Sequence, residues 1–354
     1  MAYLALYGGN TLDEIGLSEN VVYTISLSGN EDVEIYLQED DVFFPGFIDI
    51  HAHVDISTQS IGCTPGSLLR SGVIAAADAG TFGYATWKNN RQTRDFAVRD
   101  WISLIPDGLA QHPHVPSFCL EDCDWGRKLT SLFQHDRDQL IGLKIRLGQH
   151  DQQEDRHLLM LGVKWARYLR VPLMVHPTKT FLSIEEVVEP LQSQDILTHA
   201  FQGHQGSIVQ QGKVVSKIFD AMERGVWLDV AHGANHFSFE VFQLALANGI
   251  VPHTVSTDLT QNTQNKPPVY NFAYVVSKLL AAGMSWREIY RGSFAHPFQY
   301  FNTQLSLNHL VVLQFNERLE VFRDAMGQAI VGSGVWEVML VVANGRLVFN
   351  RYTQ

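Results

Sequence analysis

The segment FPGFIDIHAH, residues 44–53, is the stretch of this sequence that decides the fold. Its apolar run is typical of a strand that is buried on both faces. Side chains two positions apart on a strand point the same way, so His51 and His53 are expected to lie together at its carboxyl end. Two imidazoles placed in this way can bind one metal ion, although short histidine pairs also occur by chance in loops.

Seven further short apolar runs predict strands, at 73–80, 115–122, 140–148, 171–176, 195–203, 226–233 and 253–260. Longer amphipathic stretches predict helices at 91–105, 125–136, 152–170, 183–192, 213–224, 236–248 and 269–283. Eight strands that alternate with helices fit a closed parallel barrel. A doubly wound sheet would need a glycine-rich phosphate loop after the first strand, and none follows it. We therefore predict an α/β fold with a (β/α)8 TIM barrel over residues 44–304.

The two ends of the chain have a different pattern. Apolar and polar residues alternate in YLALYGGN near the start and in VWEVMLVVANGRLVFN, residues 335–350, near the end. This alternation, interrupted by turn residues, is typical of antiparallel strands. We expect segments 1–43 and 305–354 to pair into one small β domain beside the barrel.

The charge of the chain narrows the classes of partner. A formal net charge of −11, without a cluster of Lys or Arg, argues against binding to nucleic acid or to an anionic membrane. No apolar run approaches the roughly 18–20 residues that span a bilayer, and no signal segment is recognisable at the N-terminus. We expect a cytoplasmic protein with a small-molecule substrate. The oligomeric state is left open; a homo-oligomer is one expectation, because barrels of this class often form oligomers.

Polar side chains stand at the ends of several predicted strands. Lys144 lies in the fourth strand and His176 ends the fifth. His199 lies near the end of the sixth strand, and Asp258 ends the eighth. Catalytic groups of (β/α)8 barrels come from the carboxyl ends of the strands. Any one of these residues could be a hydrogen-bonded core residue, but their shared position indicates an active site.

These motifs resemble the amidohydrolase superfamily. The similarity rests on PGFIDIHAHVD, on the lysine within the fourth strand and on STD in the eighth, and it extends over nearly the whole chain. The longer phrases DAGTFG, GLKIR, DILTHAFQG, DVAHGANHFSFE and TVSTDL are similar to the amidohydrolase/deacetylase metallohydrolase branch, whose members are related to dihydroorotases. The resemblance implies a binuclear metal site with a carboxylated lysine.

Carried over to this chain, the resemblance implies six metal ligands, namely His51, His53, Lys144, His176, His199 and Asp258. The histidine pair and the aspartate would hold one divalent ion, and the other two histidines would hold a second. The lysine, after capturing CO₂ as a carbamate, would bridge the two ions. Zn²⁺ is the expected metal, although the ligand types also suit Mn²⁺, Fe²⁺ or Co²⁺. The alternative for the lysine is a buried salt bridge to a carboxylate.

The implied chemistry is hydrolysis of an amide or an ester. Two metal ions that share a water molecule lower its pKa, and we predict that the resulting bridging hydroxide attacks a carbonyl carbon. Asp258 is predicted to act first as general base and then as general acid toward the leaving group. The favoured activity is removal of an acyl group from a small acetylated amine or hydroxy acid, as in a deacetylase.

Two other functions are considered. One is the opening of a cyclic amide, as in dihydroorotases and hydantoinases. The other is a degenerate, non-catalytic barrel that acts as a binding subunit. A missing ligand would mark the degenerate barrel, but all six ligand positions are occupied by suitable residues.

Three further residues are predicted to bind substrate. Arg146 lies two positions after the lysine, so it shares the inward face and could bind a carboxylate, or form a structural ion pair. His232 ends the seventh strand and could contact substrate or orient a ligand. Thr81 follows the second strand and could contact substrate or support the site. The chain departs from the branch at His236, where a small polar residue is usual, and at Thr260, where histidine is common.

Overall fold

The computed structural model describes residues 2–7, 9–12, 17–19, 22–27, 33–37, 40–55, 60–87, 96–111, 123–148, 151–301, 305 and 308–352. Seven strands form one parallel sheet in the order β15-β12-β11-β10-β9-β8-β7. Their bounds are β7 Phe47–Ala52, β8 Val73–Gly83, β9 Ala97–Ser103, β10 Leu140–Arg146, β11 Leu173–His176, β12 Ile196–Leu197 and β15 Trp227–Leu228.

The eighth strand position closes this sheet into a barrel. Thr254 forms a parallel bridge with Asp229, next to β15. On the other side, the amide of His53 donates to the carbonyl oxygen of Leu259 at 2.9 Å, and the amide of Asp258 donates to that of His51 at 2.6 Å. The segment that follows Thr254 therefore lies between the last strand of the sheet and the first. The predicted (β/α)8 barrel is confirmed.

The third strand of the barrel differs from the prediction. A helix was expected at 91–105, but residues 97–103 form β9, between β8 and β10. Arg99 and Asp100 give this segment the polar content of an amphipathic helix. The guanidinium of Arg99 instead donates to backbone carbonyls, including that of Leu140 at 2.5 Å, so its charge is accommodated at a strand. The strand predicted at 115–122 lies outside the described residues.

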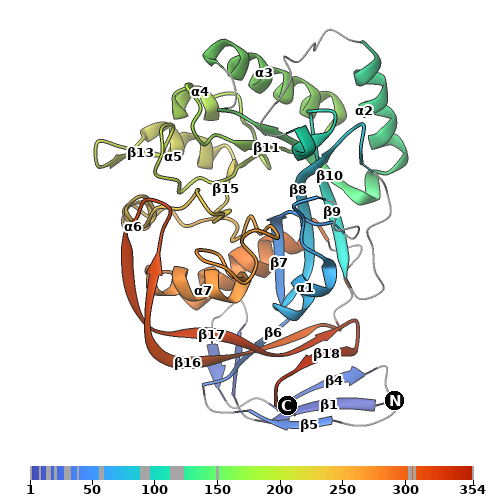
Figure 1. Ribbon diagram of the computed structural model, residues 1–354, viewed down its shortest axis with the longest axis vertical. Helices are drawn as coiled ribbons and strands as arrows, with labels where there is room; N and C mark the ends of the chain where they lie inside the picture. Colours follow the sequence, from blue (N-terminus) through green and yellow to red (C-terminus); the bar gives the residue numbers. More distant parts are fainter. Residues whose placement is uncertain are drawn as a thin grey trace.

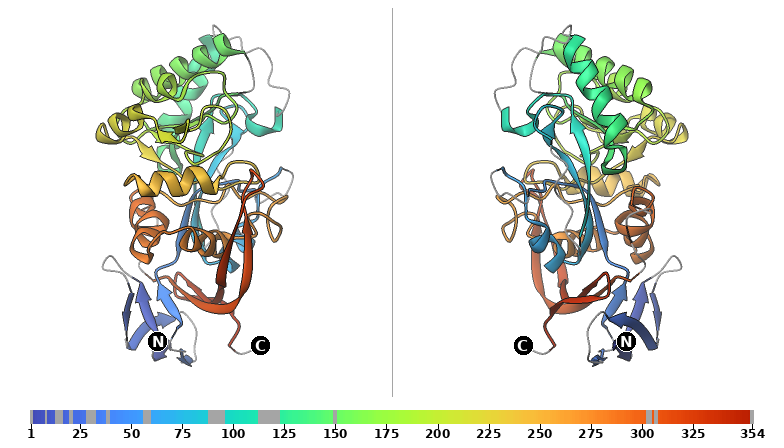
Figure 2. Two further views of the ribbon diagram at one scale, coloured as in Figure 1. Left: turned by 90° about the vertical axis from the view of Figure 1, so that its left-hand side faces the viewer. Right: turned by 90° about the vertical axis from the view of Figure 1, so that its right-hand side faces the viewer.

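Helices cover the outside of the sheet (Figures 1 and 2). They are α1 Pro65–Arg70, α2 Cys123–His135, α3 Gln152–Leu169, α4 Ile184–Val188, α5 Ser216–Glu223, α6 Phe239–Ala247, α7 Phe272–Ala281, α8 Trp286–Tyr290 and α9 His296–Phe298, with a π-helical turn at Arg291–Ala295. Polar side chains cap the N-termini of several helices. Asp151 accepts hydrogen bonds from two amides of α3, and Asn271 accepts one from an amide of α7. In the described part of the chain, no helix has both the length and the apolar character needed to cross a bilayer.

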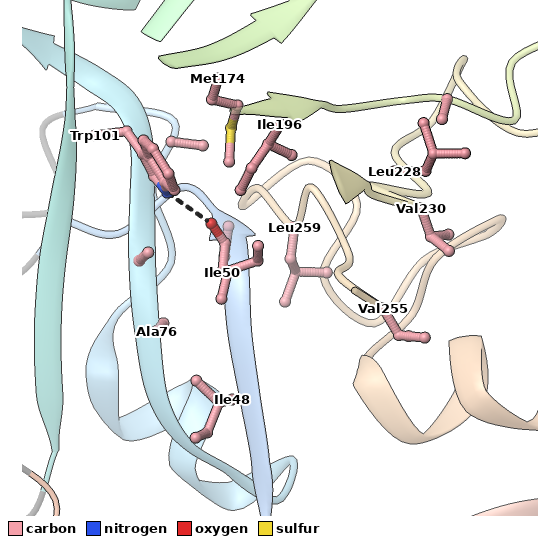
Figure 3. Close-up of a cluster of buried hydrophobic side chains, with 14 of the residues drawn as sticks. Ile48, Ile50, Ala76, Trp101, Met174, Ile196, Leu228, Val230, Val255 and Leu259 are labelled. Atoms are coloured by element: carbon pink, nitrogen blue, oxygen red, sulfur yellow. Dashed lines mark hydrogen bonds between the residues drawn. The ribbon is translucent and has the colours of Figure 1, made fainter. Parts of the chain in front are cut away.

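Apolar side chains from around the sheet form the main core (Figure 3). Ile50, Met174 and Leu228 come from three different strands and are fully buried. The indole nitrogen of Trp101 donates to the carbonyl oxygen of Ile50 at 3.1 Å, which ties the third strand to the first. This core supports the carboxyl ends of the strands, where the predicted site residues lie.

The two chain ends form two smaller sheets at the opposite end of the molecule from α2 and α3 (Figure 1). One has the order β4-β1-β5, and the other has the order β18-β17-β16-β6-β2-β3. The bounds are β1 Ala2–Tyr7, β2 Asn10–Leu12, β3 Leu17–Glu19, β4 Val22–Leu27, β5 Val33–Tyr36, β6 Val42–Phe44, β16 Leu310–Arg323, β17 Ala329–Ala343 and β18 Arg346–Asn350; a separate hairpin joins β13 Val209–Gln210 to β14 Lys213–Val214. Pairing of β6 with β16 joins the N-terminal and C-terminal segments in one sheet. The domain boundaries at residues 43 and 305 stay a prediction.

Candidate metal centre

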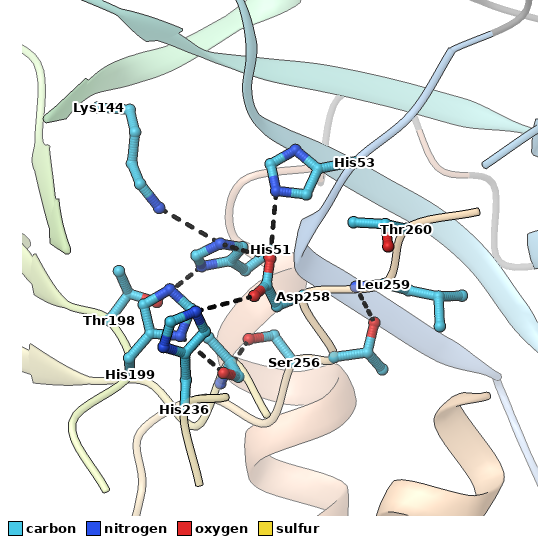
Figure 4. Close-up of polar contacts among 12 residues, drawn as sticks. His51, His53, Lys144, Thr198, His199, His236, Ser256, Asp258, Leu259 and Thr260 are labelled. Atoms are coloured by element: carbon cyan, nitrogen blue, oxygen red, sulfur yellow. Dashed lines mark hydrogen bonds and ion pairs between the residues drawn. The ribbon is translucent and has the colours of Figure 1, made fainter. Parts of the chain in front are cut away.

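The carboxyl ends of the barrel strands surround one cavity (Figure 4). Its polar lining includes all six predicted ligands, one of the three predicted substrate residues and one additional histidine: His51, His53, Lys144, Arg146, His176, His199, His236 and Asp258. These residues come from β7, β10, β11 and the segments after β12, β15 and Thr254. The barrel therefore brings together side chains that are far apart in the sequence.

One carboxylate oxygen faces both histidines of the first strand. Oδ1 of Asp258 lies 3.1 Å from Nε2 of His53 and 3.5 Å from Nε2 of His51. Burial opposes ionisation of Asp258, but the hydrogen bonds from the two histidines hold its pKa well below the usual range. This group offers two nitrogen atoms and an anionic oxygen to a cation.

Three imidazoles form a second group beside the first. The ring centroid of His199 lies 4.4 Å from that of His176 and 4.2 Å from that of His236. One ring nitrogen of each lies within 4.8 Å of the others, and His199 forms a similar group with His51 and Asp258. Burial holds the pKa of His176 and of His199 well below the ordinary value, so both are neutral, the form that binds metals.

Lys144 points toward His51 and lines the same cavity as both groups. Its Nζ atom is 3.3 Å from Nε2 of His51 and 3.2 Å from Sδ of Met174. Among the described residues, no carboxylate forms an ion pair with it, so the alternative of a buried salt bridge has no partner there. Burial lowers the pKa of the ammonium group to about 7. A neutral amine is therefore accessible near neutral pH.

Hydrogen bonds orient the imidazoles. Thr198 Oγ1 lies 2.7 Å from Nδ1 of His51 and donates in turn to Asp229. The carbonyl oxygen of Ala231 accepts from Nδ1 of His199 at 2.7 Å. In each case the other ring nitrogen, Nε2, is on the side of the ring that can face a ligand in the cavity. Thr198 and Asp229 were not among the predicted site residues, although each is a polar residue within an otherwise apolar predicted strand.

Arg146 lines the cavity, whereas Thr81 and His232 do not. The Nε atom of Arg146 is buried and has no hydrogen-bond partner within the described segments. Thr81 Oγ1 lies 2.8 Å from Nδ1 of His53, so it orients that histidine. His232 is fully buried; its Nδ1 donates to the carbonyl oxygen of Gly233, and its Nε2 accepts from Nζ of Lys278 at 2.9 Å. The predicted substrate contacts of Thr81 and His232 have no support in this geometry.

Several residues of the site have unusual backbone conformations. His199 and Asp258 adopt left-handed φ angles of 51° and 50°, which are uncommon for residues other than glycine and cluster at functional sites. Gly233 has a φ of +51°, and a Cβ atom there would lie 2.4 Å from Oδ2 of Asp258. Glycine at this position therefore allows the backbone to approach the carboxylate.

The residues fit a divalent-metal centre. Nε2 of His176 is buried and has no hydrogen-bond partner in the part of the chain that the structure describes. A buried polar atom without a partner destabilises a fold by about 1–3 kcal/mol, a cost that a bound cation would remove. Imidazole nitrogens together with a carboxylate oxygen are the ligands that Zn²⁺ and similar ions prefer.

Comparisons with known proteins find similar sequences and a similar fold. No protein-family model matches the chain. The chain is 30% identical over 277 residues to Deacetylase Atu3266 of Agrobacterium fabrum, covering 72% of this chain and 64% of that protein. It is 28% identical over 295 residues to a deacetylase of Brucella anthropi, covering 77% and 69% of the two chains. A solved dihydroorotase has the same fold, with a TM-score of 0.82, 22% identity and 99% of both chains covered. The aligned region thus spans less than two thirds of the Agrobacterium protein.

Proposed function

We propose that the chain is a member of the amidohydrolase superfamily and a metal-dependent hydrolase that removes an acyl group from nitrogen or oxygen of a small anionic molecule. The observation that carries this proposal is the convergence of all six predicted ligands on one cavity. The two relatives named as deacetylases favour acyl removal over other hydrolytic reactions.

We infer that the site holds two divalent ions, with Zn²⁺ as the expected metal. His51, His53 and Asp258 would hold one ion, and His176 and His199 would hold the other. When bound, such a pair of ions supplies an activated water molecule at neutral pH and polarises the substrate carbonyl group. The neutral, oriented imidazoles on both sides of the cavity support this assignment.

Lys144 is proposed to join the two ligand groups as a carbamate. A neutral lysine nitrogen attacks the carbon of CO₂, a C–N bond forms, and one proton is released. The product is an anionic oxygen donor in place of a cationic ammonium. A buried amine that faces an imidazole and a thioether, with a pKa of about 7, is suited to this reaction.

Asp258 is proposed to move the proton during catalysis. Its low pKa keeps the carboxylate ionised at neutral pH, so it can accept a proton from the attacking water. It can then pass this proton to the leaving nitrogen or oxygen atom. Its Oδ1 faces the first histidine pair and its Oδ2 lies 3.9 Å from Nε2 of His236, so both oxygens are directed into the cavity region.

Arg146 is proposed to bind a carboxylate of the substrate and so to select anionic substrates. Its planar guanidinium binds carboxylates through two parallel hydrogen bonds. It forms no ion pair with any described carboxylate, and its buried Nε atom has no partner. An anionic substrate would supply that partner. The expected class is therefore an N-acylated amino acid or an O-acylated hydroxy acid.

Metal analysis combined with a substrate screen tests the proposal. Protein purified with zinc in the medium is expected to contain two metal ions per chain and to lose activity on chelation. N-acetyl amino acids and O-acetyl hydroxy acids are expected to react faster than dihydroorotate or hydantoin rings. Faster ring opening would identify a cyclic amidohydrolase instead, and a folded protein that binds no metal would identify a non-catalytic barrel.

A further inference from the structure

His236 is a histidine in the cavity for which the six-ligand assignment has no role. It belongs to the segment between β15 and α6, and it lines the cavity with the predicted ligands. Its Nδ1 atom is buried and has no hydrogen-bond partner. Its Nε2 atom lies 3.9 Å from Oδ2 of Asp258, which is beyond hydrogen-bond distance. Neither ring nitrogen of His236 is therefore satisfied within the described structure.

The ring of His236 lies against the two histidines of the proposed second metal ion. Its centroid is 4.2 Å from that of His199 and 5.0 Å from that of His176. The three side chains present one nitrogen each within a span of 4.8 Å. Two nitrogens on one tetrahedral Zn²⁺ ion lie about 3.4 Å apart, given Zn–N bonds of about 2.0–2.1 Å. An inward movement of the rings by roughly an ångström would place all three nitrogens on one ion.

A second unpartnered nitrogen points to the same ligand. Nε2 of His176, a residue that is only 4% exposed, also has no hydrogen-bond partner among the described residues. Nδ1 of His199 is occupied by the carbonyl oxygen of Ala231, which leaves its Nε2 for the cavity. Each of the three imidazoles therefore has a nitrogen that can bind a cation, and one nitrogen of each ring lies within 4.8 Å of the others. A hydrogen-bonded core cluster would instead pair these atoms with donors or acceptors.

The segment that carries His236 is held in place from outside the barrel. The carbonyl oxygen of Phe237 accepts from the amide of Ala325 at 3.0 Å, and the amide of Phe239 donates to Asp324 at 2.9 Å. Both partners lie in the turn between β16 and β17, two strands of the terminal sheet. On the barrel side, Ser238 donates from its amide to the carbonyl oxygen of Phe201 at 2.9 Å. His236 is thus fixed close to the cluster before any ligand binds.

We propose that His236 is a third histidine ligand of the second metal ion, so that His176, His199 and His236 hold this ion together. The inference rests on the proposed function only in requiring that an ion binds at His176 and His199. A third imidazole makes the affinity for the second ion higher than two histidines and a bridging group provide.

Graded chelation of the zinc-loaded protein tests this inference. Three variants are compared with the wild type: His236→Leu, His236→Asn and the control His204→Asn. His204 lies on the same rim and bonds the carbonyl oxygen of Asn235 at 2.9 Å, but it is not part of the cluster. Metal content is measured by mass spectrometry at each chelator concentration, and circular dichroism checks the fold. Both His236 variants are expected to hold the second ion more than about 100-fold more weakly, with the first ion unchanged.

The Co²⁺-substituted protein gives a second readout that is independent of affinity. Each histidine that binds Co²⁺ gives a strongly shifted imidazole N–H proton resonance. Both His236 variants are expected to show one such resonance fewer than the wild type and the His204 control. Unchanged affinity and an unchanged number of resonances would overturn the inference while leaving the proposed function intact. A wild-type protein that binds no ion would overturn both.

Discussion

The Nε2 nitrogen of His53 lies 3.1 Å from Oδ1 of Asp258, although the two residues are 205 positions apart in the chain. The two segments are also joined through their backbones, since the amide of Asp258 donates to the carbonyl oxygen of His51 and the amide of His53 donates to that of Leu259. The contact that closes the barrel therefore also assembles the first half of the candidate metal centre. Changes at this closure are expected to affect activity more than stability.

Asp258→Asn is expected to lower kcat by about 10²–10⁴-fold, because the amide cannot accept the proton that the carboxylate carries. The size of the side chain is unchanged, so circular dichroism and thermal unfolding should resemble the wild type. Turnover numbers for the best acetylated substrate provide the measurement. Near-normal turnover would contradict the proton-transfer role.

Lys144→Ala is expected to lower activity and metal content, because the group that joins the two ligand sets is removed. Small carboxylic acids such as acetate or propionate should restore part of both, since they can occupy the place of a carbamate. Lys164→Ala, at an exposed position of α3, serves as the control and should behave like the wild type. Absence of any rescue, together with full metal content, would argue against a bridging role.

Arg146→Met is expected to raise KM for substrates that carry a carboxylate by about 10–100-fold, which corresponds to the loss of a charged hydrogen bond of about 1.5–3 kcal/mol. Neutral analogues with the same acyl group should be affected much less. Steady-state kinetics on matched pairs of methyl-ester and free-acid substrates make the comparison. An equal rise for both members of a pair would rule out carboxylate recognition.

Gly233→Ala is expected to abolish most of the activity, because the new Cβ atom would lie 2.4 Å from Oδ2 of Asp258 and 2.8 Å from a ring carbon of His236. Gly249→Ala is the matched control. Gly249 also has a positive φ angle, of +77°, but a Cβ atom there meets open space. Backbone strain should destabilise the fold by about 1–2 kcal/mol in both variants. Gly233→Ala should lose more stability because of the close contact, and it alone should impair turnover. Equal activities of the two variants would contradict the close packing inferred at Gly233.

The metal-free protein is expected to lose stability as the pH falls from about 6.5 to about 4. Burial lowers the pKa of both His253 and His309 to about 4 in the folded state, from an ordinary value of 6.5. Between these values the unfolded chain binds more protons than the folded one, so protonation favours unfolding. Urea unfolding at pH 7.5 and at pH 5 measures the difference. His253→Asn should reduce it, and a free energy of unfolding that is constant over this range would contradict the assignment.

Much of the barrel could be predicted from the sequence because its strands are short apolar runs with polar residues at one end. The strand that ends in His176 follows this rule and lies where predicted. The helix after Asp151 was predicted from its amphipathic pattern, and it also lies where predicted. β9 does not, because Arg99 satisfies its charge on backbone carbonyls from distant segments. A contact of that kind leaves no periodic signal in the sequence.

The predicted ligands also share one cavity, since the end of a strand is a position that the sequence specifies. The support around them was not predictable. Thr198 and Asp229 act through hydrogen bonds between neighbouring strands, and Asp324 reaches the site region from the terminal sheet. Such contacts depend on how distant segments pack. His232 was predicted to bind substrate because it ends a strand, but it is buried in the core, where it contacts Lys278.

Anomalous X-ray diffraction from crystals of the zinc-loaded protein tests the central claim most directly. The account predicts two zinc peaks in the barrel cavity, one bounded by His51, His53 and Asp258 and the other by His176 and His199. Continuous electron density beyond Nζ of Lys144 should reach both. A fully loaded crystal with no zinc between these side chains, or with Lys144 unmodified and ion-paired to a carboxylate, would contradict it.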